Sequence, residues 1–342
     1  MIYNFECDYA EGALSEVMSA LCATNLEQTS GYGEDDHCRR ARQFICGCMG
    51  KEAEVQFVVG GTQANTIVLT AALRPHEAAV CATSGHINTH ETGAPEAAGH
   101  KVISFPGIDG KISPRDVQRA LDEHMPVHTA KPRMVYISQP TEWGTVYSLD
   151  ELRALYEFTR AHDMYLFIDG ARLGCALGRE GADMTLAQLA GSCDVFTIGG
   201  TKCGALFGEA IVINAPEIAR DIRYIIKQRG AMLAKGRLLG VQFEPLMANG
   251  AELYLRASRH ACECAQRLAA GFAARGIAMR CDSPTNQIFP ILSDEQCGAL
   301  RSTASFLIME KTEDGRNVAR FVCSWATSDE AVQALLDAIA RM

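Results

Sequence analysis

The stretch DVFTIGGTKCGA, from Asp194 to Ala205, carries the pattern that decides the fold. It begins with an apolar run, Asp194–Ile198, that is unbroken rather than alternating. Such a run is typical of a strand that is covered on both faces in a largely parallel sheet. Two glycines, a threonine and Lys202 follow the run directly. Because ligands of open α/β sheets bind at the carboxyl ends of the strands, we expect Lys202 to line a binding crevice.

Similar apolar runs occur on both sides of this stretch, and helical patterns lie between several of them. The runs are Val55–Val59, Ala79–Ala82, Lys101–Ser104, Met134–Ser138, Met164–Asp169 and Ala210–Ile213. The helical patterns between them are Gln63–Leu73, Asp150–His162 and Leu186–Gly191. This alternation predicts an α/β fold with a mostly parallel, seven-stranded sheet.

The sequence changes in character after Pro216. Long helical patterns come first, then short strand candidates, then a last helix: Glu217–Gln228, Leu233–Arg275 with a break near Asn249–Gly250, Ala278–Cys281, Gln287–Ile291, Ser305–Ile308, Ala319–Cys323 and Asp329–Arg341. We therefore expect a large α/β domain with an N-terminal arm over residues 1–240, and a small α+β domain over residues 241–342.

Composition and charge exclude several classes of protein. Among 342 residues, 32 are Lys or Arg and 41 are Asp or Glu, and the net charge of −9 argues against a nucleic-acid or anionic membrane surface. No run of 18 apolar residues predicts a membrane span. The fourteen cysteines have no zinc-ribbon spacing, and the acidic N-terminus does not resemble a signal peptide. These features predict a cytoplasmic protein with reduced thiols.

Three strand ends carry residues that can bind a ligand. The segment GGTQAN follows Val55–Val59, and Gly61 and Thr62 at a helix N-terminus can offer N–H groups to a phosphate. The alternative is an ordinary turn with Thr62 as the N-cap. Both G-x-G-x-x-G and G-x₄-G-K-[ST] are absent here, which disfavours a nucleotide-binding α/β protein.

The other two strand ends carry Asp169 and Lys202. Taken alone, each has an ordinary alternative: a helix-capping aspartate and a solvated surface lysine. Lys202 lies among small residues, and desolvation lowers the pKa of a lysine and makes its amine nucleophilic. Three such groups together can hold pyridoxal 5′-phosphate (PLP). They are a cup for the phosphate, an aspartate that keeps the pyridine nitrogen protonated, and a lysine that bonds the aldehyde.

Four segments in this order resemble a known family. GGTQAN, GHINTHETGAPEAAGHK, FIDGARL and DVFTIGGTKCGA are similar to the low-specificity threonine aldolases of the β-eliminating lyase group. The resemblance covers nearly the whole chain. It implies the PLP-dependent transferase fold type I, and cleavage of L-threonine, L-allo-threonine or a relative such as phenylserine to glycine and an aldehyde.

The resemblance also implies roles for individual residues. Lys202 matches the lysine that bonds the cofactor, Asp169 the pyridine partner, and His86 the histidine that stacks on the cofactor ring. Arg172 and Arg320 match arginines that hold the substrate carboxylate. The remaining matches are Gly61 and Thr62 for the phosphate cup, and His128 for a second active-site histidine. His128, or a water held by His86, is the expected base for the β-hydroxyl proton.

The segment KQRGAMLAKGRLLG, Lys227–Gly240, resembles the stretch that lends basic residues to a neighbouring subunit. Lys227 and Lys235 match those residues, and Tyr32 in GYGEDD resembles a tyrosine that is also lent. The resemblance therefore implies a homodimer or homotetramer in which the active site is shared.

One departure from the family concerns the N-terminal segment. The family has a serine before an aspartate, and its hydroxyl helps to bind the carboxylate, whereas this chain has Cys7-Asp8. A thiol is a weak donor. Cys7 therefore binds the carboxylate weakly, leaves it to other residues, or packs against the sheet without meeting substrate.

Other functions stay open at this stage. A PLP-dependent aminotransferase or β-eliminating lyase shares the same cofactor residues, and a non-catalytic PLP-fold binding protein is the alternative from another class. His86 and His90, followed by Glu91, have the spacing of a metal pair. No third ligand lies nearby, so we expect no metal site.

Overall fold

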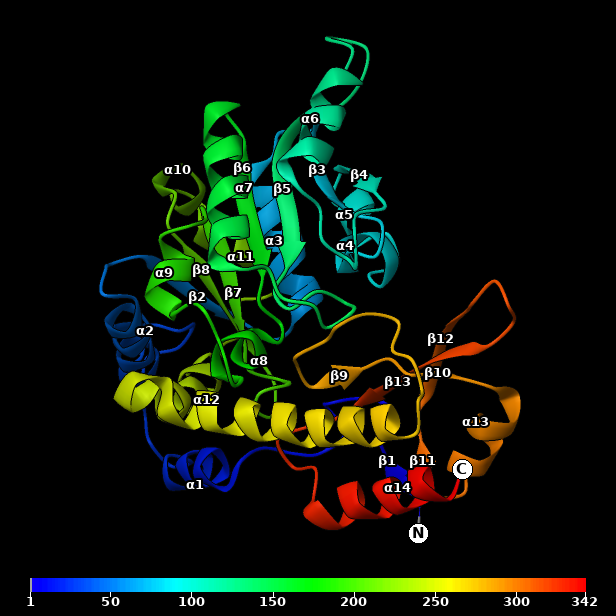
Figure 1. The fold of residues 1–342 in the computed structure, drawn as a ribbon. Coiled ribbons are helices and arrows are strands. Elements are labelled where there is room, and N and C mark those ends of the chain that lie inside the picture. The colour runs from blue at the N-terminus through cyan, green and yellow to red at the C-terminus, as the bar shows by residue number, and fades with distance from the viewer. Residues whose placement is uncertain (1) are drawn as a thin grey trace.

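A seven-stranded sheet forms the centre of the upper part of the molecule (Figure 1). The computed structural model describes residues 2–342. The strands lie in the order β2-β8-β7-β6-β5-β3-β4. Their bounds are Glu54–Val58 (β2), Glu77–Ala82 (β3), Lys101–Phe105 (β4), Lys131–Ser138 (β5), Tyr165–Asp169 (β6), Val195–Gly199 (β7) and Glu209–Ile213 (β8). β8 is antiparallel to both of its neighbours and the remaining pairs are parallel, which confirms the mostly parallel seven-stranded sheet.

Helices cover both faces of this sheet, which explains why its strands are apolar without alternation. One apolar core joins one face of the sheet to α3 (Gly61–Ala72), α4 (His86–Thr89), α10 (Pro216–Ala219) and α11 (Ile222–Gln228). A second core joins the other face to α1 (Ser15–Ala23), α2 (Asp36–Met49), α6 (Pro114–Asp122), α7 (Leu149–Ala161), α8 (Leu173–Gly178), α9 (Leu186–Ala190) and part of α12 (Arg237–Ala274). The short helix α5 (Ala94–Ala97) packs beside α3 and β4.

Local sequence signals set several helix ends. Ser148 accepts a hydrogen bond from the N–H of Glu151, and the Glu151 carboxylate accepts from the N–H of Ser148, which starts α7. Asp35 caps α2 by accepting from the N–H of Cys38, and Gly50 ends α2 with a left-handed φ of 67°.

Helix α12 links the two parts of the chain. Leu239 and Phe243 belong to the core under the sheet, whereas Leu268 and Phe272 belong to a separate C-terminal core. The backbone leaves helical geometry at Ala248–Ala251, which confirms the predicted break. The helix begins at Arg237 rather than at the expected Leu233, and the expected helix 217–228 is divided into α10 and α11.

The C-terminal part has its own small antiparallel sheet and two helices. Its elements are β9 (Gln287–Ile288), β10 (Ile291–Leu292), β11 (Ala304–Ser305), β12 (Leu307–Lys311), β13 (Asn317–Val322), α13 (Asp294–Leu300) and α14 (Asp329–Arg341). Instead of the expected strand 278–281, the chain forms an isolated bridge between Met279 and Pro290.

The N-terminal segment joins this C-terminal part. β1 (Tyr3–Asn4) pairs in parallel with β11, and Phe5 is buried in the C-terminal core. Since α12 contributes to both cores, the division of the chain near residue 240 stays a prediction.

Within residues 2–342, no helix combines the length and apolar character that crossing a membrane needs. The structure describes all fourteen cysteines and leaves each of them as a free thiol.

Candidate active site

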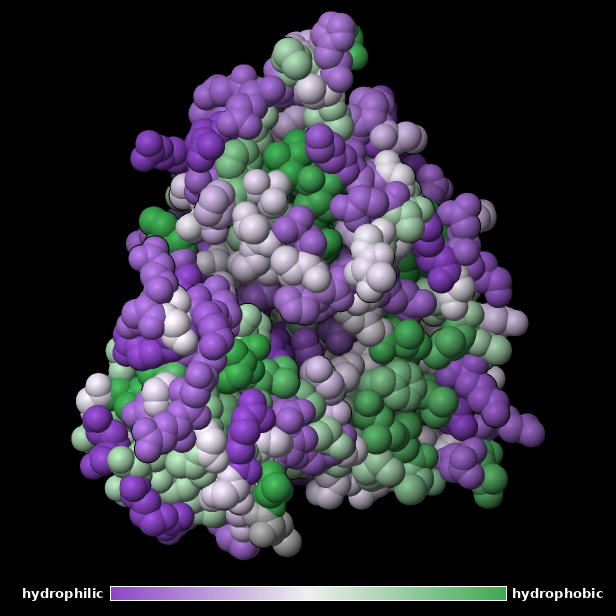
Figure 2. Space-filling view, turned by 90° about the vertical axis from the view of Figure 1, so that its right-hand side faces the viewer, coloured by the Kyte–Doolittle hydropathy of each residue, from purple (hydrophilic) through white to green (hydrophobic). Residues whose placement is uncertain are grey.

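The carboxyl edge of the sheet brings three predicted strand ends together. Asp169 is the last residue of β6, Lys202 lies three residues beyond β7, and Gly61 begins α3 shortly after β2. β6 and β7 are parallel neighbours, so Asp169 and Lys202 lie at the same edge. Figure 2 shows the surface hollowed between the part built on this sheet, above, and the C-terminal part, below. The parts needed for a cofactor site therefore converge where the sequence predicts them.

Asp169 is held as a buried, ionised carboxylate. It accepts hydrogen bonds from the Tyr136 hydroxyl at 2.6 Å, the Asn65 amide at 2.9 Å and the N–H of Ala171 at 2.9 Å. Burial raises its pKa, but the nearby His86 and these donors outweigh burial and hold the pKa below its usual value. A carboxylate has about four acceptor positions, so about one is left for a further donor.

His86 is fixed by a second buried carboxylate. Its Nδ1 donates to Oε1 of Glu91 at 2.7 Å, and the Asn65 amide donates to the same oxygen at 2.7 Å. Burial lowers the pKa of His86, but Glu91 and the charge of Asp169 raise it above its usual value. Asn65 therefore connects Glu91 to Asp169, and both carboxylates favour the protonated form of His86 by raising its pKa.

Lys202 lies among both positive and negative groups. Burial lowers the pKa of its amine, and the charge of Arg172 lowers it further. Asp8, Glu209 and Asp169 act in the opposite direction, but the net shift is downward. The structure therefore gives Lys202 the partly desolvated surroundings that the sequence predicts.

The start of α3 is open and has no side-chain cap. Its N-cap is Gly60, and a Cβ atom added at Gly60 or Gly61 would meet nothing within 4 Å. The alternative in which Thr62 caps the helix is wrong, because Thr62 is already inside the helix. The first N–H groups of α3 have no intrahelical partner and are available to an anion.

Arg172 is already bound by an aspartate of the N-terminal segment. Its Nε and Nη2 donate to the two oxygens of Asp8 at 2.6 Å and 3.0 Å, and Asn286 also donates to Asp8 at 2.9 Å. Burial raises the pKa of Asp8, but the charges of Arg172 and Lys202 bring it below its usual value. This pair leaves Nη1 of Arg172 for another ligand.

Arg320 has more unused donors. Its Nη2 donates to the carbonyl oxygen of Glu6 at 3.1 Å, and its buried Nε has no partner. Burial and the charge of Arg172 lower the pKa of Arg320, whereas Cys7 and Asp8 act in the opposite direction. Cys7 is half-buried and does not belong to the core under the sheet.

The structure does not bring His128 to this site. His128 is exposed and lies three residues before β5, at its amino end. β5 has eight residues, so it is roughly 26 Å long and its carboxyl end is the one that faces the site. The interpretation of His128 as an active-site histidine is corrected for this reason.

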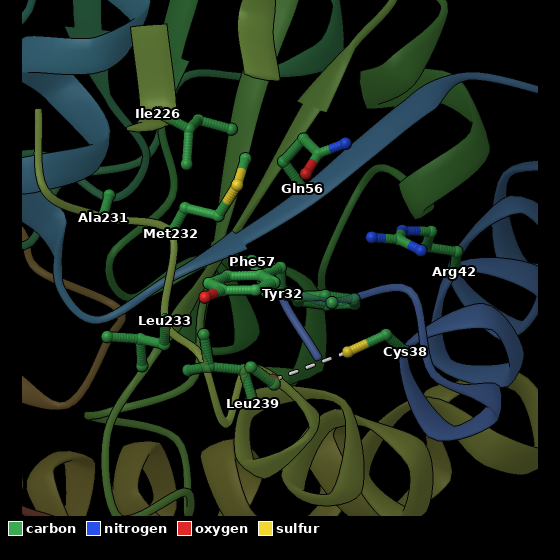
Figure 3. Close-up of a pocket in the computed structure, with 12 residues that line it drawn as sticks. Tyr32, Cys38, Arg42, Gln56, Phe57, Ile226, Ala231, Met232, Leu233 and Leu239 are labelled. Carbon is green, nitrogen blue, oxygen red and sulfur yellow. Dashed lines mark hydrogen bonds between the residues drawn. The ribbon is translucent and has the colours of Figure 1, made fainter. Parts of the chain in front are cut away.

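Tyr32, Lys227 and Lys235 also lie apart from Lys202 within one chain. Tyr32 lines a small cavity with Phe57, Met232 and Leu239 (Figure 3). The Lys227 amine lies 4.8 Å from the centre of the Tyr32 ring, and Lys227 and Lys235 are exposed.

Sequence reasoning missed Asn65, Tyr136 and Glu209, and it missed that the buried Glu91 accepts a hydrogen bond from His86. Glu209 is 3% exposed, its Oε2 has no partner, and burial raises its pKa well above the usual value. Asn65 and Glu91 occur within the quoted segments GGTQAN and GHINTHETGAPEAAGHK. The available signal for Glu209 was a charged residue directly before the apolar run Ala210–Ile213. Within residues 2–342, no three His, Cys, Asp or Glu side chains are placed to hold a metal ion.

Comparisons with known proteins agree with this geometry. Residues 5–295 match the family model described as beta-eliminating lyase. The low specificity L-threonine aldolase of Pseudomonas aeruginosa is 32% identical, covering 97% of this chain and 95% of that protein. The solved threonine aldolase of Leishmania major is 40% identical, covers 99% of both chains and has a TM-score of 0.97.

A more distant structure extends the likeness in fold alone. An aspartate aminotransferase of Thermus thermophilus is 18% identical, covers 99% of this chain and 91% of that chain, and has a TM-score of 0.74. The resemblance seen in the sequence is confirmed: the chain has the type I fold of PLP-dependent enzymes and belongs to the beta-eliminating lyase family.

Proposed function

We propose that this chain is a PLP-dependent threonine aldolase, a carbon–carbon lyase. Its substrates are L-threonine, L-allo-threonine or related β-hydroxy-α-amino acids such as phenylserine, and its products are glycine and an aldehyde. One observation carries the proposal: an ionised Asp169 and a partly desolvated Lys202 lie on adjacent strand ends beside two arginines. Relatives named threonine aldolase support it over an aminotransferase or a non-catalytic binding protein.

The residues of the carboxyl edge fit PLP. Lys202 would bond the aldehyde, Asp169 would hold a proton on the pyridine nitrogen with its remaining acceptor position, and His86 would lie against the ring. Gly61 and Thr62 offer the N–H groups of the open α3 terminus to the phosphate. When bound, PLP accepts the electron pair of the bond that breaks at the substrate α-carbon.

Arg320 and Arg172 orient the substrate by its carboxylate. Arg320 contributes Nε and its free Nη1, and Arg172 contributes the nitrogen that Asp8 does not use. A guanidinium holds a carboxylate in one plane, which a lysine cannot do. Holding the carboxylate fixes the rotation about the α-carbon, and with it the bond that is positioned to break.

We also propose that two chains share each site in a homodimer or homotetramer. A groove lined by Tyr32, Arg223, Tyr224, Lys227 and Met232 leaves the Tyr224 side chain 79% exposed. The PLP phosphate carries nearly two negative charges, whereas the α3 terminus offers only dipoles and a hydroxyl. Lys227 and Lys235 of a second copy supply the missing positive charge, and Tyr32 of that copy adds a hydroxyl donor. A cytoplasmic location is part of the same proposal, and the fourteen free thiols support it.

Aldehyde release tests the function directly. The purified protein with PLP is expected to form glycine and an aldehyde from threonine, allo-threonine and phenylserine with no keto acid added. Lys202→Ala is expected to abolish release and the visible absorbance of bound PLP, and Lys101→Ala, an exposed lysine of β4, controls for loss of charge. Amino transfer to an added keto acid without aldehyde formation would contradict the proposal.

A further inference from the structure

The C-cap of α4 is a second histidine, His90, whose ring is stacked on that of His86. The ring centres of His86 and His90 lie 5.5 Å apart, and the ring planes differ by 22°. Nδ1 of His90 lies 2.5 Å from the hydroxyl of Thr89, which also lies 3.2 Å from the carbonyl oxygen of Gly85. When Thr89 donates to Gly85, it accepts the Nδ1 proton of His90, and Nε2 of His90 keeps its lone pair.

The surroundings push the two histidines toward opposite charge states. Glu91 and Asp169 raise the pKa of His86 against the effect of burial. Burial lowers the pKa of His90, and the charges of His86, Arg320 and Lys202 lower it further. Two neighbouring groups with divergent pKa values are an arrangement that divides acid and base roles in active sites. At neutral pH, His90 is the neutral member of the pair.

The ring stack on His86 places His90 beside the candidate site, where Arg320 and Lys202 are among the charges that act on it. Arg320 is the proposed partner of the substrate carboxylate, and Lys202 lies where the substrate amine must react. The carboxylate and the amine are both attached to the α-carbon. A second histidine stacked on His86, on the side of these two partners, is therefore a candidate to serve the β-hydroxyl, which is attached one carbon from the α-carbon.

We propose that His90 is the general base that removes the β-hydroxyl proton during cleavage, an inference that rests on the proposed aldolase function. The hydroxyl proton goes to Nε2 of His90, and the electron pair of that O–H bond forms the aldehyde carbonyl. The Cα–Cβ bond breaks, and its electron pair stays on the α-carbon, whose charge bound PLP would take up. A proton then returns to the α-carbon to give glycine, so the atoms of threonine equal those of glycine plus acetaldehyde.

Two other groups compete for this role. His128 lies at the amino end of β5, which is the end opposite to the candidate site. Glu142 follows the carboxyl end of β5, but its Oε1 accepts from the Ser138 hydroxyl at 2.5 Å and from the N–H of His86 at 3.0 Å. Glu142 therefore positions the start of α4, whereas His90 has a free ring nitrogen.

The first experiment separates cleavage from the earlier chemistry. His90→Asn is expected to lower kcat for aldehyde release from threonine by about 10²–10⁴-fold, the usual contribution of a general base. Exchange of the glycine α-hydrogen in D₂O uses the cofactor site without a β-hydroxyl, so His90→Asn is expected to leave it within about threefold of the wild-type rate. His76→Asn, an exposed histidine beyond the amino end of β3, is the matched control.

The outcomes distinguish failure of this assignment from failure of the aldolase function. A wild-type protein that releases no aldehyde contradicts both. Unchanged cleavage in His90→Asn contradicts only the His90 assignment, as does a loss that appears with Glu142→Gln or His128→Asn instead. Equal losses of cleavage and exchange in His90→Asn would also overturn it, because they would indicate a general defect of the site.

A second test uses the wild-type protein, so its outcome does not depend on whether a variant folds. NMR titration of the histidine C2 protons in cofactor-free protein is expected to give His90 a pKa below its ordinary value and His86 a pKa above it. In the wild-type holoenzyme, kcat for cleavage is then expected to fall as the pH drops through the pKa of His90. The reverse order of the two histidines, or a wild-type profile without that limb, would contradict the proposal.

Discussion

Two regions of the molecule differ in how many of their polar and charged groups find partners within one chain: the carboxyl edge of the sheet, and the groove around Tyr32 and Lys227. At the edge, Asp169 and Asp8 are buried and receive three hydrogen bonds each, and their partners come from segments far apart in the sequence. In the groove, aromatic and basic side chains are exposed, and the Lys227 amine faces only the ring of Tyr32. Folding of one chain thus fixes the buried groups of the edge, whereas under the proposed function the charge for the phosphate comes from assembly with a second copy.

The largest expected effect tests whether the edge is held together by buried charge. Asp8→Asn removes the negative partner of the buried Arg172, and breaking a buried ion pair on one side destabilises a protein by about 3–5 kcal/mol. We expect a loss of this size in the free energy of unfolding measured with urea. Glu6→Gln, a half-buried neighbour, is the control and is expected to change stability little.

The contribution of Asp8 to the free energy of unfolding is expected to depend on pH. Its pKa in the folded state lies below the ordinary value, so its contribution is present at neutral pH and is lost as the pH falls through that lowered pKa. The difference in stability between wild type and Asp8→Asn should therefore shrink in acid. A difference that is constant with pH would show that the ion pair is not its cause.

The next effect tests Asp169, the buried carboxylate that is the proposed partner of the pyridine nitrogen. Asp169→Asn keeps the shape but removes the charge, and loss of one preorganised electrostatic group lowers kcat by about 10²–10³-fold. PLP absorbance should persist, because Lys202 is still present. An Asp169→Asn protein with wild-type kcat would mean that the pyridine nitrogen is held elsewhere.

The groove is expected to respond differently from the edge. Removing Lys227 and Lys235 should leave the unfolding free energy of the chain nearly unchanged, because both side chains are exposed. If a second copy uses them on the phosphate, the dissociation constant for PLP should rise by about tenfold or more for each lysine, as for hydrogen bonds to charged groups.

The paired control for this test is Lys101→Ala with Lys131→Ala, two exposed lysines at the amino ends of β4 and β5. Sedimentation should show a dimer or tetramer whose dissociation by dilution weakens PLP binding. An active monomer would remove the idea of a shared site.

The same contrast explains what the sequence could predict. Lys202 and Asp169 follow unbroken apolar runs, so strand position alone places them at the carboxyl edge. The same reasoning could have excluded His128, because it precedes a strand instead of following one. The contact between Asn65 and Asp169 joins residues 104 positions apart, and the pairing of β1 with β11 joins the two ends of the chain. No local pattern encodes such contacts, because they form only when the complete sheet and the C-terminal core are assembled.

The smallest expected effect concerns Cys7, at the boundary between the fixed edge and the substrate. Cys7 is half-buried next to Asp8 and close enough to Arg320 to influence its pKa, which favours a place near the substrate carboxylate. Cys7→Ser replaces a weak donor by a stronger one. We expect a lower KM for threonine, by the roughly 0.5–1.5 kcal/mol of one hydrogen bond, with kcat nearly unchanged, since the same contact stabilises ground state and transition state alike.

Cys22→Ser, an exposed cysteine of α1, is the matched control for this change and is expected to leave both constants as they are. If Cys7→Ser also leaves KM unchanged and lowers only the stability, the side chain packs without meeting substrate. The carboxylate is then held by Arg320 and Arg172 alone. Steady-state kinetics of the two variants therefore show whether Cys7 contacts the substrate carboxylate or only packs beside Asp8.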